Sequence, residues 1–238
     1  DLPALLHLAA DVPCPEPMEK QETRPARCRI AVAMDQAFSF YYQDNLDELE
    51  AAGAELRYFS PLNDRALPEA DGLYLGGGYP ELYLSRLAQN ETMRESIRRA
   101  IENGMPTVAE CGGFLYLQSS LKDENGTLWP MVGALGGTGY GTDRLQRFGY
   151  LTLTGARDSL LLRAGEAVPA HEFHYWDCTD CGTDLTAIKA NGRTWPCGFA
   201  GESLYAAFPH FHWGGEIPMA ARFVQAAEAY REAKRHEA

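Results

Sequence analysis

Short apolar runs alternate with stretches of helical periodicity between residues 29 and 121. Four of these runs predict buried strands, over residues 29–35, 54–60, 71–78 and 105–110. Helices are predicted between them, within residues 38–53 with Gly53 as the stop, over residues 91–104, and from residue 111 onward. This alternation is typical of an α/β fold with a doubly wound, mostly parallel sheet.

Beyond residue 130 the pattern becomes rich in strands. The β-like runs span residues 147–155, 167–176, 185–193 and 198–213. Short runs of this kind, separated by turns, indicate an antiparallel extension of the sheet. The last stretch, residues 217–238, predicts a helix with Phe223, Ala226, Ala227 and Tyr230 on its buried side.

The first 28 residues have a different pattern. DLPALLHLAA carries leucines at helical spacing, and the following residues, 11–28, contain four prolines and mixed charges. We interpret residues 1–28 as the tail of an upstream domain followed by a linker. The domain with the α/β pattern then runs from residue 29 to residue 238.

Composition narrows the function classes. The net charge of −12, from 21 basic and 33 acidic side chains, argues against a nucleic-acid or anionic-membrane partner. No apolar run approaches the ~20 residues that a membrane span needs. Six cysteines at irregular spacing do not resemble the disulfide framework of a secreted protein, so a reducing cytoplasm is predicted.

The stretch VAECGGFLYL places Cys111 where a buried strand meets a helix. In an open parallel sheet, ligands collect at the carboxyl ends of the strands. A nucleophile on a tight strand-to-helix turn needs glycines beside it, and Gly112 and Gly113 meet that need. The helix N-terminus also favours a thiolate and an oxyanion. The alternative interpretation is a buried structural cysteine.

A second glycine cluster, LGGGYPE at residues 75–81, follows the preceding predicted strand. Its backbone N–H groups could face the same crevice and complete an oxyanion hole with the turn at Cys111. The alternative is a sharp turn that leads into a helix.

A cysteine nucleophile usually works with a histidine that is distant in sequence. His7 and His236 lie near the ends of the chain and are poor candidates. The remaining histidines form two pairs, His171 with His174 in HEFHY and His210 with His212 in FPHFHW. A metal site built from such a pair lacks matching carboxylates.

Two further patterns suggest ligands but lack the required residues. Cys178, Cys181 and Cys197 with His174 could form a zinc knot, but their irregular spacing favours a β-turn with incidental cysteines, and we predict no metal. The run GGTGYG at residues 136–141 is not followed by the lysine of a phosphate loop, so a flexible connection is predicted.

With LGGGYPELY, ECGGFLYL, YQDNLDELEAAGAEL and the late HFHW considered together, the chain from about Arg29 onward resembles the glutamine amidotransferase domain of the cobyrinic acid a,c-diamide synthase family. The resemblance implies a class I amidotransferase fold in which Cys111 attacks the side-chain amide of glutamine. It also implies that Gly112, with Gly77 or Gly78, holds the oxyanion.

The resemblance places the catalytic histidine in FPHFHW, with His210 favoured and His212 second. The acidic residue that follows this histidine by two positions in many class I amidotransferases is absent, because position 212 is a histidine. A Cys-His dyad is therefore expected.

The resemblance further implies an upstream synthetase domain that holds ATP and Mg and amidates a tetrapyrrole carboxylate, with no cofactor in residues 29–238. Two alternatives remain open from the residues alone. One is a different cysteine-nucleophile hydrolase, and the other is a non-catalytic regulatory or binding domain with the same fold.

Overall fold

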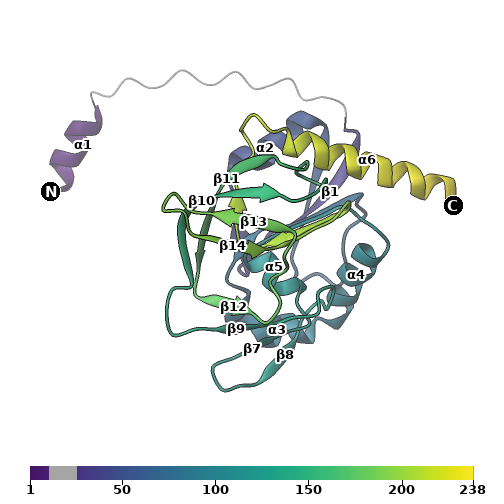
Figure 1. Cartoon of the computed structure of the whole chain (residues 1–238), viewed down its shortest axis with the longest axis horizontal. Helices are drawn as coiled ribbons and strands as arrows, with labels where there is room; N and C mark the ends of the chain where they lie inside the picture. The colour runs from purple at the N-terminus through teal and green to yellow at the C-terminus, as the bar shows by residue number, and fades with distance from the viewer. Residues whose placement is uncertain (11–25, 238) are drawn as a thin grey trace.

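The computed structural model describes residues 1–10 and 26–237 (Figure 1). Its centre is a six-stranded sheet in the order β15-β16-β6-β4-β1-β3, in which all strands are parallel except β15. The strands are β1 (Cys28–Ala33), β3 (Ala54–Phe59), β4 (Gly72–Leu75), β6 (Thr107–Glu110), β15 (Phe199–Ala200) and β16 (Leu204–Ala207). This architecture confirms the predicted α/β fold with a mostly parallel sheet.

Helices cover both faces of this sheet. They are α2 (Gln43–Ala52), α3 (Leu84–Gln89), α4 (Glu91–Glu102), α5 (Gly112–Leu117) and α6 (Met219–Glu237), with a 3₁₀ turn at Pro80–Tyr83. Alternate residues of β1 point to opposite faces: Ile30 belongs to the core with α2 and α6, and Ala31 to the core with α3, α4 and α5. Apart from the partly exposed Arg29, the residues of β1 are buried and apolar, so the strand reads as a short hydrophobic run.

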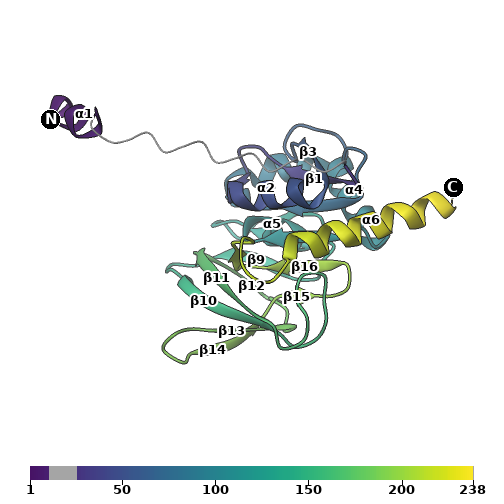
Figure 2. The same cartoon turned by 90° about the horizontal axis from the view of Figure 1, so that it is seen from above.

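The antiparallel strands extend the central sheet only through β15. Five further strands form a separate antiparallel sheet in the order β14-β13-β10-β11-β17. These strands are β10 (Arg147–Gly155), β11 (Ala167–His174), β13 (Leu185–Ile188), β14 (Thr194–Cys197) and β17 (His210–Phe211). Figure 2 shows β10, β11, β13 and β14 as a layer beside the α/β part. This layer brings β17 beside β11, which places His210 opposite His171.

Six shorter strands form two small sheets. A four-stranded sheet in the order β12-β9-β7-β8 contains β7 (Ser120–Lys122), β8 (Leu128–Pro130), β9 (Thr138–Gly141) and β12 (Trp176–Cys178). A two-stranded sheet pairs β2 (Phe38–Phe40) with β5 (Gly77–Gly78). The second pair carries the glycine cluster predicted to face Cys111.

The helix predicted from residue 111 onward is present but short, and the flexible connection predicted for residues 136–141 was wrong. The helix that begins after Cys111 ends at Leu117, because the next residues pair as β7 with both β8 and β9. The second half of GGTGYG is strand β9 rather than a flexible connection. There Gly139 packs closely, and a Cβ at this position would lie 2.4 Å from Leu121 Cδ2. Tertiary pairing outweighed local propensity in both segments.

The amino-terminal segment forms helix α1 (Leu2–Ala10), as its leucine spacing predicted, and α1 buries none of its side chains. The predicted linker falls largely on residues 11–25, which lie outside the described residues. Its assignment to the tail of a synthetase domain stays a prediction. Across the described residues, no helix combines the length and apolarity needed to cross a bilayer.

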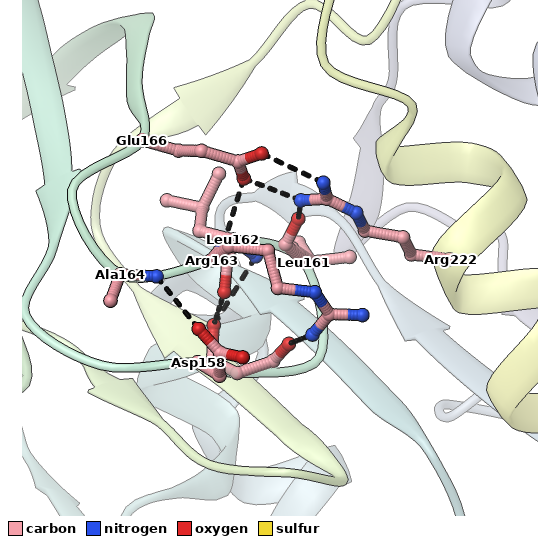
Figure 3. Close-up of polar contacts among 8 residues, drawn as sticks. Asp158, Leu161, Leu162, Arg163, Ala164, Glu166 and Arg222 are labelled. Carbon is pink, nitrogen blue, oxygen red and sulfur yellow. Dashed lines mark hydrogen bonds and ion pairs between the residues drawn. The ribbon is translucent and has the colours of Figure 1, made fainter.

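A polar cluster anchors the loop between β10 and β11 on helix α6 (Figure 3). Arg222 of α6 donates to both carboxylate oxygens of Glu166 and to the carbonyl oxygen of Leu161. Glu166 also accepts from the backbone N–H of Arg163 at 2.7 Å. These hydrogen bonds, with that of Arg222 the strongest, lower the pKa of Glu166 to about 2.

This cluster predicts a stability difference that depends on pH. The pKa of Glu166 is lower in the folded chain than the ~4.3 of a free glutamate. The ionised carboxylate therefore contributes its full share to folding stability above pH ~4.3, and this contribution is lost as the pH falls towards 2. We expect Glu166→Gln to lower the free energy of unfolding at pH 7 by about 1 kcal/mol, since the pair is partly exposed to solvent. Urea unfolding of the wild type and of Glu166→Gln at pH 7 and at pH 4 measures this loss. The difference in free energy of unfolding between the two proteins should be smaller at pH 4 than at pH 7. The exposed Glu202→Gln serves as control, and an equal loss in both variants would contradict the prediction.

Candidate functional site

Cys111 lies in a strained turn between β6 and α5. Its backbone angles are φ 48° and ψ −101°, and it is the only non-glycine residue with positive φ among the described residues. Its N–H donates to the carbonyl oxygen of Ala207 at 2.9 Å, which fixes the turn to the neighbouring strand. Such strain persists only where the surrounding structure imposes it, and it clusters at functional sites. The side chain is partly exposed, so the alternative of a fully buried structural cysteine is not supported.

The two glycines after Cys111 are required by close packing. A Cβ on Gly113 would lie 2.1 Å from the carbonyl oxygen of Leu75. A Cβ on Gly112 would lie 2.9 Å from the carbonyl oxygen of Gly78 and 3.0 Å from its nitrogen. The turn and the β5 glycine cluster therefore converge, as the sequence predicted.

Within that cluster, Gly77 and Gly78 have different surroundings. Gly78 lines the pocket at Cys111. Its φ is 151°, and a Cβ at this position would lie 2.1 Å from the carbonyl oxygen of Ala37, so no side chain fits there. Gly77 instead packs under an imidazole, and a Cβ there would lie 2.6 Å from Cε1 of His210. The geometry thus favours Gly78 as the partner of Gly112.

His210 comes from strand β17 and shares one pocket with Cys111. The pocket measures about 200 Å³ and is lined by Phe40, Gly78, Tyr79, Cys111, His171, Phe173 and His210. His210 itself is buried. A small, mostly apolar cavity with a thiol and an imidazole on its wall suits a compact substrate and nucleophilic catalysis.

A buried carboxylate lies on the other side of the imidazole. Glu110 is 2% exposed, and its Oε2 lies 3.3 Å from Nδ1 of His210. Burial alone would lower the pKa of His210, but its interactions with Cys111 and Glu110 outweigh burial and raise that pKa to about 10. Glu110 directly precedes Cys111 but was not predicted as a site residue, because the family pattern places the acid two positions after the histidine.

The model of the CobB/CobQ-like glutamine amidotransferase domain matches residues 29–216. The chain belongs to this family. The match confirms the resemblance found in the motifs around Gly77, Cys111 and His210, and it makes the chain a glutamine amidotransferase domain.

Curated relatives agree with this family. The cobyrinate a,c-diamide synthase of Caldanaerobacter subterraneus subsp. tengcongensis is 38% identical over 216 residues, covering 89% of this chain and 48% of the relative. That of Listeria monocytogenes is 42% identical over 205 residues, covering 84% of this chain and 45% of the relative. The chain therefore spans about half the length of these relatives.

Solved structures share the fold. PurLQS from Thermotoga maritima superimposes with a TM-score of 0.58 at 18% identity, covering 85% of this chain and 98% of the other. A second solved glutamine amidotransferase gives a TM-score of 0.54 at 15% identity, covering 83% and 98%. At these identities the likeness supports the α/β fold of the amidotransferase domain alone.

The other candidate histidines of this amidotransferase domain lie elsewhere or face the site differently. His212 is 52% exposed, and its Nε2 lies 2.9 Å from Asp44 Oδ2, away from the pocket lining. His171 lines the pocket, and burial together with the charge of His210 lowers its pKa. His174 is a core residue that stacks on Phe208, and burial lowers its pKa to about 4. Of FPHFHW, only His210 lines the pocket.

Two residues near the start of α2, Tyr41 and Asn45, hold the site together, and neither was predicted from the sequence. The side chain of Asn45 donates to the carbonyl oxygen of Phe211 and accepts from the N–H of Trp213, both at 2.8 Å. Tyr41 donates to the carbonyl oxygen of Ala33 and accepts from the N–H of Gly76. Asn45 thus fixes the strand that carries His210.

The cysteines of CTDC do not form a zinc knot with Cys197 and His174. Cys178 and Cys181 are joined by a disulfide, which a reading as incidental cysteines did not predict. Asp177 lies close to both sulfurs, but neither His174 nor Cys197 joins this group. Cys28, Cys111 and Cys197 are free among the described residues. A cytoplasmic location stays a prediction.

Proposed function

We propose that this domain hydrolyses glutamine by a Cys-His mechanism and releases ammonia. The observation that carries the proposal is the pairing of Cys111, held in a strained turn, with His210 across one small pocket. Family membership supplies the substrate class, since it favours the amide of glutamine over the substrates of other cysteine hydrolases.

In the first half-reaction, Sγ of Cys111 attacks the Cδ carbon of the glutamine side chain. His210 carries a proton at this point, either taken from the thiol or already present on the imidazolium. It gives this proton to the departing nitrogen as the C–N bond breaks. The products are ammonia and a glutamyl thioester. Water, activated by the now neutral His210, then attacks the thioester, and glutamate leaves as the thiol is restored.

The tetrahedral intermediates carry a negative oxygen that needs hydrogen-bond donors. We assign this role to the backbone N–H groups of Gly112 and Gly78. Gly112 stands at the start of α5, where amide groups are not used by the helix, and Gly78 approaches it closely. The helix has only six residues, so the local amides rather than a long dipole provide the stabilisation.

The ammonia is proposed to serve a synthetase. The relatives are named cobyrinate a,c-diamide synthase, and about half of their length lies outside the region that matches this chain. We assign to that missing half the ATP and Mg site and the amidation of a tetrapyrrole carboxylate. The domain described here would hold glutamine and no cofactor of its own.

An exposed aromatic surface beside the pocket supports a docking site for the proposed synthetase half. Phe148 and Tyr150 of β10 lie opposite Phe173 and His171 of β11, and their rings contact one another in edge-to-face pairs. Phe148 is 61% and Tyr150 82% exposed. His171 and Phe173 also line the pocket, so this aromatic face continues from its mouth. Exposed aromatic patches of this kind mark protein interfaces.

We infer that the aromatic face packs against the synthetase half, which would keep ammonia from solvent. In the full-length protein, Tyr150→Glu should therefore lower the amidated product formed per glutamate released by about tenfold, because a charge in an interface core disfavours docking. Glutamate release itself and amidation with added ammonia should persist, as both sites remain intact.

The control is Tyr58→Glu, which alters another exposed tyrosine. Tyr58 lies on β3, an edge strand of the central sheet, whereas Tyr150 belongs to the five-stranded sheet. Both variants are assayed with glutamine, ATP, Mg and cobyrinate, and product and glutamate are quantified together. Unchanged coupling in Tyr150→Glu, or equal uncoupling in Tyr58→Glu, would refute the docking assignment.

A further inference from the structure

We propose that Glu110 is the positioning residue for His210 and thereby completes a Cys-His-Glu triad whose acid precedes the nucleophile in sequence. This inference rests on the proposed glutaminase function. In the chain, the position two residues after His210 holds His212, which is half exposed and contacts Asp44 instead. The acid therefore has to come from another element, and β6 provides it.

The carboxylate of Glu110 is fixed by three contacts. Its Oε2 lies 3.3 Å from Nδ1 of His210 and accepts from the hydroxyl of Tyr74 at 3.1 Å. Its Oε1 accepts from the N–H of Phe211 at 3.3 Å. Two of the three contacts are with consecutive residues of β17, so the carboxylate holds both the ring of His210 and the strand that carries it.

These contacts determine which imidazole nitrogen faces the substrate. When Nδ1–H donates to Glu110, Nε2 is left to exchange protons with Cys111. The ring has room for this orientation because position 77 is glycine: a Cβ there would lie 2.6 Å from Cε1 and 3.3 Å from Nε2 of His210. Gly77 therefore admits the ring, and Glu110 sets its tautomer.

Charge balance supports the same assignment. A carboxylate that is 2% exposed is costly unless a cation or several donors accompany it. His210 is the only ion-pair partner of Glu110 within the described residues. Tyr74 and Phe211 are neutral donors. The imidazolium of His210 is thus the cation that balances this carboxylate.

The other titratable groups around His210 do not compete for this role. Those that face it are Cys111 from the turn, Glu110 from β6, and His171, Glu172 and His174 from β11. Burial lowers the pKa of both His171 and His174, so they are neutral at pH 7, and it raises that of Glu172 to about 7. The pKa of His210, about 10, is consistent with a proton held between Cys111 and Glu110.

The test is Glu110→Gln in the full-length protein. The amide keeps the shape and an oxygen acceptor but removes the charge, so the imidazolium becomes less stable. We expect kcat for glutamate release to fall about 10²-fold with little change in KM. We also expect the alkaline limb of the pH profile, where His210 loses its proton, to move down by about one pH unit or more.

The matched control is Tyr74→Phe, which removes another hydrogen bond to the same Oε2 but leaves the charge and the contact with His210. It should change kcat by less than tenfold and leave the alkaline limb in place. A purely structural role of Glu110 predicts instead that both variants lose activity in proportion to their folded fraction with an unshifted profile, and that result would overturn the proposal.

Two measurements separate this inference from the proposed function. The rate at which iodoacetamide alkylates Cys111 needs no glutamine, and its pH dependence should differ between wild type and Glu110→Gln even if no glutamate were released. If Glu110→Gln does not fold, NMR titration of the His210 ring in Cys111→Ala tests the proposal, because that variant removes the effect of the thiol on the pKa of His210 and leaves Glu110 in place. A pKa of His210 above the ordinary ~6.5 supports the proposal, and one at or below that value overturns it.

Discussion

Replacing Cys111 with alanine in the full-length protein should reduce glutamate release from glutamine by at least about 10³-fold. The reason is that no other group in the pocket can form the thioester: the lining otherwise offers imidazoles, aromatic rings and glycine. The loss should appear in kcat, while glutamine still binds. Glutamate is measured in a coupled assay, and wild-type protein that released none would refute the proposed function itself.

The control for this result is Cys197→Ala. Cys197 is also a free thiol, but burial raises its pKa to about 12, so it is protonated and inert at neutral pH. Its variant should keep wild-type activity once its folded fraction is accounted for. If Cys111→Ala kept more than a tenth of the wild-type rate, the nucleophile would have to be another group.

The features that the sequence predicted are those set by neighbours in the chain. The parallel strands follow from apolar runs, and α2 ends at Gly53 because its φ of 105° suits glycine. Cys111 was identifiable because the two glycines after it serve a turn that only they can form. Such signals are local, so one sequence is enough to find them.

The features it missed depend on distant contacts. Glu110 contacts a histidine 100 positions later, and Asn45 holds a strand 166 positions later. No local pattern distinguishes a strand-end glutamate that meets an imidazole from one that meets solvent. The choice between His210 and His212 was likewise open from the sequence. Residues two apart share a face only while the strand stays regular, and β17 ends at Phe211, before His212.

Changing His210 to alanine should cause the second large loss, about 10³-fold in kcat. Without the imidazole, Cys111 has no partner to take its proton and the departing nitrogen has no acid. Because the pKa of His210 is about 10, the wild-type pair should hold its proton on the imidazole throughout the neutral range. Alkylation of Cys111 by iodoacetamide at pH 7 should therefore slow in the variant and recover as the pH rises towards the ~8.5 of an ordinary thiol.

His212→Ala is the matched control, since it removes a histidine of the same segment that contacts Asp44 outside the pocket. It should keep activity within about threefold and leave the alkylation profile unchanged. The reverse pattern, with His212→Ala inactive and His210→Ala active, would mean that the segment rearranges when glutamine binds. Because Asn45 ties Phe211 and Trp213 to α2 on both sides of His212, such a rearrangement would have to break both hydrogen bonds, and the structure argues against it.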